Sequence, residues 1–345
     1  MVAHGLANVC RLGAPFVAVN QVRRRRRGCT LGHPVSRRCH LAAKAAIAAL
    51  ALAGCGAVSS AKHGPVQPTR SPLARTRGGK PSHIAVILME NEEYGSIIGS
   101  RSTPYINALA RRYALASAMY AVGHPSLPNY LALTGGSTFG VNSDCTDCSV
   151  GATSLVDQFD RAGVSWKAYM EDLPSPCFTG AGAGGYAKKH DPFVYYTRVT
   201  RDPARCNRVV PLAQLSADEH AHALPAFIWI TPNLCHDMHD CDPATGDRFL
   251  SGLVPALLKG LGRGGLLFLT WDEGSSDAGC CRLASGGHIA TIVAGQAARP
   301  GARMRTPSDH YSLLQTTEDL LGLPRLRGAA CACTPSLQPL LRRIG

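Results

Sequence analysis

The sequence predicts an α/β domain built on a largely parallel sheet, and two observations lead to this. Three runs, 85–89, 226–230 and 266–270, are apolar almost throughout. Such runs fit strands that are buried on both faces, as in a parallel sheet covered by helices. Helical patterns alternate with these runs between about residues 82 and 325, which is the order typical of α/β domains.

The elements follow one another in a readable order. Thr103-Pro104 begins a helical pattern with proline in its first turn, and 154–162 forms another, leading into a short strand at 164–169. An apolar stripe from 249 to 261 predicts a helix that Pro255 should start or kink. Residues 174–215 show few periodic signals, so we expect a loop-like segment that covers the site.

Polar residues follow each of the three apolar runs. Glu90-Asn91 follows the first run, Asn233 and the stretch 236–240 follow the second, and Asp272-Glu273 comes at the end of the third. Because ligands bind at the carboxyl ends of parallel strands, these residues should share one crevice. Their oxygen donors favour one divalent cation, Mg²⁺, Ca²⁺ or Mn²⁺. Each pair alone would also fit a solvated strand end.

Ser126 is the candidate nucleophile. It lies in His124-Pro125-Ser126-Leu127-Pro128-Asn129-Tyr130, just before an apolar segment, and so near the amino end of a helix. Free N–H groups and the helix dipole favour anions there. A hydroxyl at this place can attack phosphorus if a metal lowers its pKa. The alternative is a serine that only caps the helix.

Thirteen histidines are present, and only some lie near these segments. The nearby ones are His124, His236, His239, His288 and His310. His190, His220 and His222 lack a convincing context. His288 precedes the apolar run 289–293, so reaching the site from there requires an antiparallel strand or a loop that doubles back. A buried, satisfied histidine is the alternative for each.

Residues 1–54 read as an export signal. They hold nine Lys/Arg and no acidic residue, and a short apolar run ends in Leu52-Ala53-Gly54-Cys55. This order resembles a bacterial lipobox, in which the cysteine is lipidated. Residues 55–81 then read as a lipidated Cys55 and a flexible tether, and 82–345 as the catalytic domain. Sec or Tat export and the true start codon stay open.

The net charge of +13 belongs almost entirely to this leader and tether, because residues 81–345 sum to about −1. Nucleic-acid binding needs a basic face on the folded domain, so we expect no nucleic-acid partner. We expect a bacterial protein on the outer side of the cell membrane, held there by its lipid anchor, or a secreted one.

Ten cysteines follow Cys55, and an even number in an exported chain favours disulfides. Cys145/Cys148 and Cys235/Cys241 are close enough in sequence to form local bridges. A zinc site at Cys145-x-x-Cys148 is the weaker alternative, since no second pair has the usual spacing.

Seven segments in order resemble the phosphoesterase family that holds bacterial phospholipases C and a group of acid phosphatases. They are HIAVILMENEEYGSIIG, TPYINALARRY, HPSLPNYLALTGG, ITPNLCHDMHDC, FLTWDEG, GGHIATIVAG and HYSLLQTTEDLLGLP. The resemblance implies an alkaline-phosphatase-like three-layer sandwich with a largely parallel central sheet.

The resemblance also implies roles for single residues. Glu90, Asn91, Ser126, Asp272 and Glu273 would gather round the metal, with Ser126 as nucleophile. Histidines would bind the phosphoryl group or protonate the leaving oxygen, and His124, His239 and His288 match best. We expect His236, Asp240 and Asn129 to contact the substrate.

The sequence therefore predicts an exported, metal-dependent phosphoric-ester hydrolase of the acid-phosphatase type with a serine nucleophile. A phospholipase C-type phosphodiesterase is the first alternative, because both classes share this core. A non-catalytic cell-surface binding protein on the same fold is the alternative from another class. The oligomeric state stays undetermined.

Overall fold

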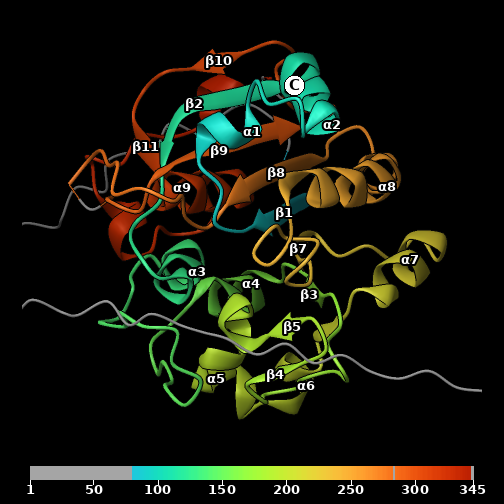
Figure 1. Cartoon of the computed structure of the whole chain (residues 1–345). Coiled ribbons are helices and arrows are strands. Elements are labelled where there is room, and N and C mark those ends of the chain that lie inside the picture. The colour runs from blue at the N-terminus through green and yellow to red at the C-terminus, as the bar shows by residue number, and fades with distance from the viewer. Residues whose placement is uncertain (1–79, 283, 343–345) are drawn as a thin grey trace, which may run out of the picture. The chain divides into compact units, whose positions relative to one another are not determined.

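The computed structural model describes residues 80–282 and 284–342 (Figure 1). The expected export signal, the lipobox cysteine Cys55 and nearly all of the tether lie outside these residues. Within the described part of the chain, no helix is both long enough and apolar enough to cross a membrane.

A nine-stranded sheet runs through the centre in the order β10-β2-β9-β8-β1-β7-β3-β6, with β11 paired to β2. Its strands are β1 (Ile84–Met89), β2 (Ala114–Tyr120), β3 (Trp166–Met170), β6 (Val209–Pro211), β7 (Phe227–Thr231), β8 (Leu266–Trp271), β9 (His288–Ala294), β10 (Arg303–Met304) and β11 (Ser308–Asp309). β4 (Gly182–Ala183) and β5 (Tyr186–Ala187) form a separate hairpin. The fold is α/β with a mixed, mostly parallel sheet, as the sequence predicts.

Only β9 runs against its neighbours: it pairs antiparallel with β2 and with β8, while the other pairs of the large sheet are parallel. When two neighbouring strands run antiparallel, one begins at the edge of the sheet where the other ends. His288 therefore lies at the carboxyl edge of β8. This is the antiparallel strand that the sequence required for His288.

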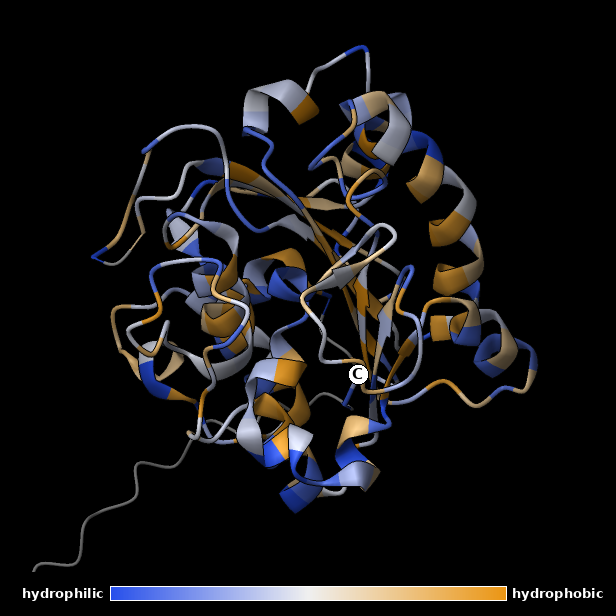
Figure 2. Cartoon of the chain, turned by 60° about the horizontal axis from the view of Figure 1, so that its bottom comes forward, coloured by the Kyte–Doolittle hydropathy of each residue, from blue (hydrophilic) through white to orange (hydrophobic). Residues whose placement is uncertain are grey.

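Helices cover both faces of the sheet. They are α1 (Tyr94–Ile97), α2 (Pro104–Arg112), α3 (Ser126–Gly135), α4 (Leu155–Ala162), α5 (Thr197–Thr200), α6 (Pro203–Cys206), α7 (Ala213–His220), α8 (Pro243–Leu261) and α9 (His310–Leu321). α2 packs on α8, and α3 packs on α4 and α9. Figure 2 shows the strands in the hydrophobic colour between these helices. The layers are helix, sheet, helix.

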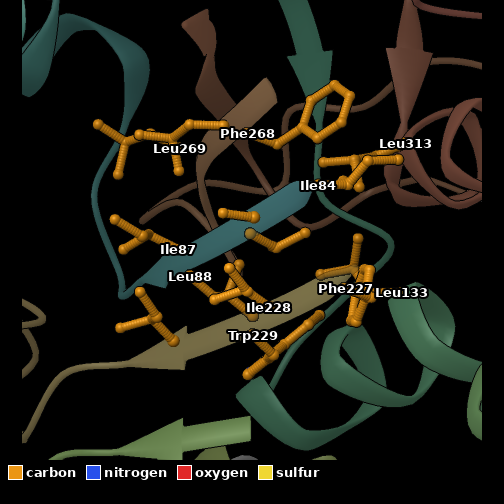
Figure 3. Close-up of a cluster of buried hydrophobic side chains, with 14 of the residues drawn as sticks. Ile84, Ile87, Leu88, Leu133, Phe227, Ile228, Trp229, Phe268, Leu269 and Leu313 are labelled. Atoms are coloured by element: carbon orange, nitrogen blue, oxygen red, sulfur yellow. The ribbon is translucent and has the colours of Figure 1, made fainter. Parts of the chain in front are cut away.

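The core explains why the three apolar runs form the central strands. All six residues of β1 and of β8 are buried, and Ile228 and Trp229 of β7 pack beside Ile84 and Ile87 (Figure 3). Residues inside the sheet meet a helix on either face, so apolar side chains are favoured at successive positions rather than at alternate ones.

The helix predicted to begin at Thr103-Pro104 is confirmed as α2, and the one predicted at 154–162 is confirmed as α4, with Ser154 as its N-cap. The helix predicted from the stripe at 249–261 was too short. The observed helix α8 begins at Pro243, so Pro255 lies inside it rather than at its start. The buried face at Leu250, Val254 and Leu257 holds the turn that proline weakens. Segment 174–215 is not a plain loop, since it holds β4 to β6, α5, α6, the start of α7, and the 3₁₀ turns at Lys188–His190 and Pro192–Tyr195.

Two further 3₁₀ turns, Arg327–Ala330 and Gln338–Leu340, follow α9.

Candidate active site

The carboxyl ends of three neighbouring strands meet at one point, because β1 lies between β7 and β8. The Glu90 N–H donates to the Asp237 carbonyl (2.8 Å), and the Asp272 N–H donates to the Met89 carbonyl (2.9 Å). The Asn91 N–H donates to Asp272 Oδ1 (3.1 Å). These backbone bonds fix the acidic side chains in register, so the structure brings together the strand ends that the sequence pointed to.

Ser126 opens α3 directly beside these carboxylates. Its side chain is buried, and its Oγ donates to Glu90 Oε2 (3.2 Å) and lies 3.5 Å from Glu273 Oε1. Pro125 holds the N-cap position, and Ser126 is the first helical residue with no capping bond. The alternative of a serine that only caps the helix is therefore wrong: this hydroxyl faces the acidic cluster.

Glu90 is enclosed by aromatic and imidazole groups. The Tyr130 hydroxyl donates to Glu90 Oε1. His190 Nε2 lies 3.2 Å from Glu90 Oε2, and His190 Nδ1 lies 3.2 Å from Asp237 Oδ2. Both contacts of His190 are short enough for ion pairs, but neither has the alignment of a hydrogen bond. His190 also stacks on Tyr130, with ring centroids 5.5 Å apart.

Burial and mutual repulsion make these carboxylates hard to ionise. The pKa of Glu90 is well above its usual range because of burial first and the charge of Asp237 second. The pKa of Asp272 is raised by burial and then by the charges of Glu90 and Glu273. Burial likewise raises the pKa of Glu273, although His124 opposes it. Such crowding of carboxylates away from water is costly without a compensating cation.

A metal ion fits this cluster. Single ligand atoms of Glu90, His190 and His239 lie within 4.8 Å of one another. Within the described residues, Asp272 Oδ2, Asp237 Oδ2 and His190 Nε2 are buried without a hydrogen-bond partner, so these atoms are available to a cation. The donor set mixes imidazole nitrogen with carboxylate oxygen, whereas the sequence led us to expect oxygen alone. The other ligands expected from the sequence, Asn91, Ser126, Asp272 and Glu273, stay predictions.

His239 lies between a cation and a carboxylate. Lys189 Nζ lies 2.9 Å from His239 Nε2 and 3.1 Å from Asp144 Oδ2, while His239 Nδ1 lies 2.6 Å from Asp240 Oδ1. An ammonium group can only donate, so in the metal-free protein Nε2 accepts from Lys189 and Nδ1 carries the proton. A bound cation would take the same Nε2 lone pair in place of Lys189. The other oxygen of Asp144 accepts the N–H of Leu127 at the start of α3 (3.0 Å). Asp240 thus orients His239.

His124 contacts the site through Glu273. Its Nδ1 lies 2.6 Å from Glu273 Oε2 and its Nε2 lies 3.1 Å from the Ser276 carbonyl. Burial lowers the pKa of His124, but these bonds outweigh burial and raise the pKa overall. Asn129 holds this segment: its amide bonds the Gly123 N–H and carbonyl at 3.0 and 2.7 Å. The structure therefore shows Asn129 engaged with backbone, and its expected contact with substrate stays a prediction.

Two other expected histidines have different surroundings. The His288 ring stacks on Tyr94 (4.4 Å) and Tyr120 (5.0 Å), and its Nε2 lies 3.0 Å from the Ser117 carbonyl. His236 Nδ1 lies 2.9 Å from Glu171 Oε1, and its ring stacks on Phe249. Both lie at the carboxyl edge of the sheet, yet the contacts within the described residues do not join either to Ser126.

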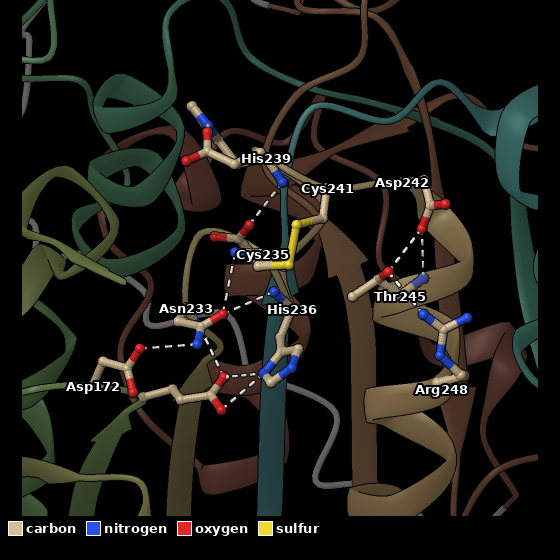
Figure 4. Close-up of a disulfide and its surroundings, with 12 residues drawn as sticks. Asp172, Asn233, Cys235, His236, His239, Cys241, Asp242, Thr245 and Arg248 are labelled. Carbon is tan, nitrogen blue, oxygen red and sulfur yellow. Dashed lines mark hydrogen bonds and ion pairs between the residues drawn. A yellow bond between two sulfur atoms is a disulfide. The ribbon is translucent and has the colours of Figure 1, made fainter. Parts of the chain in front are cut away.

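A disulfide braces the loop that carries Asp237 and His239. Cys235 and Cys241 close it, and Asn233 Oδ1 accepts the N–H groups of Cys235 (3.1 Å) and His236 (2.8 Å) (Figure 4). The ten cysteines after Cys55 form five pairs: 145–148, 177–206, 235–241, 280–281 and 331–333. Both expected local bridges are present, and zinc ligation at Cys145 and Cys148 is not.

Sequence reasoning missed His190, which it set aside for lack of context. His190 comes from segment 174–215, where no periodic pattern indicated that the chain returns to the site. The only local signal was the charged run Lys188-Lys189-His190-Asp191, which follows a Gly/Ala stretch at 180–187. Tyr130 lay inside a segment that resembles the family, and Asp237 lay in the stretch 236–240 expected at the site, but neither was given a role of its own.

Comparisons with known proteins agree with this geometry. The sequence profile of the Phosphoesterase family matches residues 96–324, which include Ser126, Asp272 and Glu273 but not Glu90 or Asn91. The chain is 35% identical over 246 residues to the phosphatidylinositol-3-phosphatase of Mycobacterium tuberculosis, covering 71% of this chain and 78% of that protein. It is 29% identical to the phosphate-repressible acid phosphatase of Penicillium chrysogenum and 30% identical to the acid phosphatase of Aspergillus niger.

The chain spans 63% of the length of each fungal relative, and these matches cover 74% and 76% of this chain. Among solved structures, an alkaline-phosphatase-superfamily protein from Vibrio parahaemolyticus superposes with a TM-score of 0.51 at 14% identity, covering 74% of this chain and 71% of that one. The lipoteichoic acid synthase LtaP from Listeria monocytogenes gives 0.54 at 10% identity, covering 77% of each chain. At these identities the matches show the fold, which is that of the alkaline phosphatase superfamily. The family match covers well over half of the chain, and together with the acidic cluster around Ser126 it shows that this chain belongs to the Phosphoesterase family and is a hydrolase of phosphoric esters.

Proposed function

We propose that this chain is a metal-dependent phosphomonoesterase in which Ser126 is the nucleophile. One observation carries the proposal: the buried Ser126 hydroxyl, at the first position of α3, donates to Glu90 in a cluster of carboxylates and histidines. A structural serine at a helix start would bond its own helix backbone. The curated relatives named above are phosphatases, which favours monoesters over the diesters of a phospholipase C.

The residues of the chain divide the work as follows. Ser126 Oγ attacks phosphorus as the bond to the leaving alcohol breaks, and Glu273 Oε1, 3.5 Å away, accepts the serine proton. A divalent cation held by Glu90, His190 and His239 would supply positive charge against the phosphoryl oxygens. Lys189 adds a second positive charge beside His239. Water then hydrolyses the phosphoserine.

We propose that His124 donates the proton to the leaving oxygen. Both of its ring nitrogens face oxygen acceptors, on Glu273 and Ser276, which favours the doubly protonated ring that a general acid needs. His239 serves the metal here instead of the leaving group, and His288, stacked between two tyrosines, takes no part in the chemistry. Asp272 and Asp237 complete the negative surroundings of the cation.

The cellular setting is part of the proposal. The five disulfides support an oxidising compartment, and Cys55 would anchor the chain to the outer side of the membrane. A non-catalytic binding protein is not favoured, because Ser126 lies beside Glu90 and Glu273 as the proposed chemistry requires.

The test measures turnover of p-nitrophenyl phosphate, bis-p-nitrophenyl phosphate and phosphatidylcholine by the wild type, Ser126→Ala and Asp272→Asn. We expect the monoester to be hydrolysed fastest and Ser126→Ala to lose on the order of 10⁴-fold or more in kcat while still binding metal. Asp272→Asn should lose activity together with metal affinity. The double variant should be little worse than the poorer single one, because the groups act as a unit.

Ser82→Ala is the matched control. It removes a hydroxyl that donates to the Leu261 carbonyl just before β1, at the opposite edge of the sheet, and should leave kcat unchanged. Full activity in Ser126→Ala would refute the serine nucleophile and leave direct attack by water. Faster turnover of the diester would favour the phosphodiesterase.

A further inference from the structure

A cavity of about 310 Å³ lies where α1 and α2 meet β2 and β10 at one side of the sheet. Figure 1 shows these four elements next to one another at the top of the molecule. No residue of the acidic cluster takes part in the lining. The lining residues are Tyr94, Ile98, Asn107, Ala110, Arg111, Leu115, Ser117, Arg303 and Arg305.

Three arginines and no acidic residue line this cavity. Within the described residues, no salt bridge joins Arg111, Arg303 or Arg305 to a carboxylate. The positive charge is not a general property of the domain, because residues 81–345 carry about −1 in total. Three guanidinium groups around one hollow repel one another, and an anion inside it would relieve that repulsion.

The three arginines are held differently. Arg303 is fixed: its Nη2 donates to the Ala110 carbonyl (2.7 Å), and its Nη1 donates to the Ala302 (2.9 Å) and Tyr113 (3.2 Å) carbonyls, at the end of α2. Arg111 and Arg305 are exposed like Arg303, but within the described residues their guanidinium groups make no hydrogen bond. The cavity thus has one rigid guanidinium and two that can close on a ligand.

The remaining polar groups of the lining are mostly used by the fold. The Asn107 amide donates to the carbonyls of Ile97 (2.9 Å) and Thr103 (2.8 Å), and the Ser117 hydroxyl donates to the Met304 carbonyl (3.1 Å). Arg111 and Arg305 are therefore the main free donors. Ile98, Ala110, Leu115 and the Tyr94 ring give the cavity an apolar wall.

We propose that this cavity is a second binding site, separate from Ser126, that takes the phosphate group of a phosphorylated ligand. Guanidinium groups match phosphate oxygens in paired hydrogen bonds. The volume, at the lower end of the range for ligand sites, suits one phosphate with a small organic group against the apolar wall. The ligand is either a soluble phosphate compound or a lipid headgroup. The proposal does not rest on the nucleophile or the metal proposed above.

The test counts bound inorganic phosphate by equilibrium dialysis of the full chain, without added substrate. We compare the wild type with the double variant Arg111→Gln/Arg305→Gln, which keeps Arg303 because it holds the end of α2. The control is Arg201→Gln/Arg263→Gln, which removes the same charge from exposed arginines outside the cavity.

We expect Arg111→Gln/Arg305→Gln to bind one equivalent of phosphate fewer than both other proteins, with unchanged turnover of p-nitrophenyl phosphate. Equal binding by all three proteins would overturn the proposal, and so would an equal loss in the control. Co-sedimentation with phosphatidylcholine vesicles, with and without phosphatidic acid, distinguishes the ligand sources. If sedimentation depends on phosphatidic acid and only Arg111→Gln/Arg305→Gln loses it, the ligand is a lipid headgroup. If the dialysis shows the expected difference but sedimentation does not depend on phosphatidic acid, the ligand is a soluble phosphate compound.

Discussion

Tyr130→Phe tests whether the aromatic wall of the candidate active site positions Glu90 as the proposed metal ligand. Tyr130 is fully buried, stacks on His190, and donates its hydroxyl to Glu90 Oε1. Phenylalanine keeps the ring and removes only the hydroxyl. The variant therefore leaves one oxygen of a buried carboxylate without its partner while the packing around His190 is preserved.

The magnitude follows from this geometry. A buried acceptor that loses its donor costs about 1–3 kcal/mol of unfolding free energy, or roughly 2–4 °C in Tm for each kcal/mol in a domain of this size. A group that orients a metal ligand typically contributes about 10–100-fold to metal affinity. We expect both effects in Tyr130→Phe, because the same hydroxyl serves the fold and the ligand.

The assays are urea unfolding of the metal-free protein and calorimetric titration with Mn²⁺ and Zn²⁺. Tyr196→Phe is the matched control, since Tyr196 is also fully buried and its hydroxyl bonds Thr134 Oγ1 (2.9 Å) rather than Glu90. The control should lose stability but keep metal affinity. Metal affinity that is equal in both variants and the wild type would refute the assignment of Glu90 as a ligand held by Tyr130.

Three further predictions concern pH, the disulfide loop and anchoring. Burial raises the pKa of Glu318 to about 8 from 4.5, so the folded protein keeps a proton that the unfolded chain has released. Glu318 therefore lowers the free energy of unfolding as pH rises from about 4.5 to 8. Glu318→Gln should flatten this pH dependence in urea unfolding, and an unchanged slope would contradict the prediction. Cys235→Ser/Cys241→Ser should lower kcat by roughly tenfold, because it loosens the loop that holds His239. Removing the 331–333 disulfide is the control and should leave kcat unchanged. Equal effects of the two variants on the phosphatase rate would count against the loop's role. Cys55→Ser should release the protein from the membrane fraction or block its processing, and an unmodified Cys55 in the mature, membrane-bound protein would sink the anchor.

The sequence by itself determined the sheet and one half of the site. The runs at β1, β7 and β8 are readable because strands buried on both faces need apolar residues at successive positions. Glu90, Asp272 and Glu273 are readable because they directly follow such strands, and neighbouring parallel strands end at the same edge. Ser126 was readable from a local pattern, a proline-flanked serine before an apolar helix.

Only the tertiary structure decided the rest. His190 and Lys189 reach the acidic cluster from an irregular segment, and nothing in their neighbours reveals that return, because irregular backbone has no period that fixes where a side chain points. The direction of β9 placed His288 at the right edge, yet packing turned its ring between Tyr94 and Tyr120. The arginine cavity likewise joins residues from the two halves of the chain, so its three arginines come together only because β10 pairs with β2. Local sequence fixes what each strand buries, whereas contacts between distant segments fix which side chains meet.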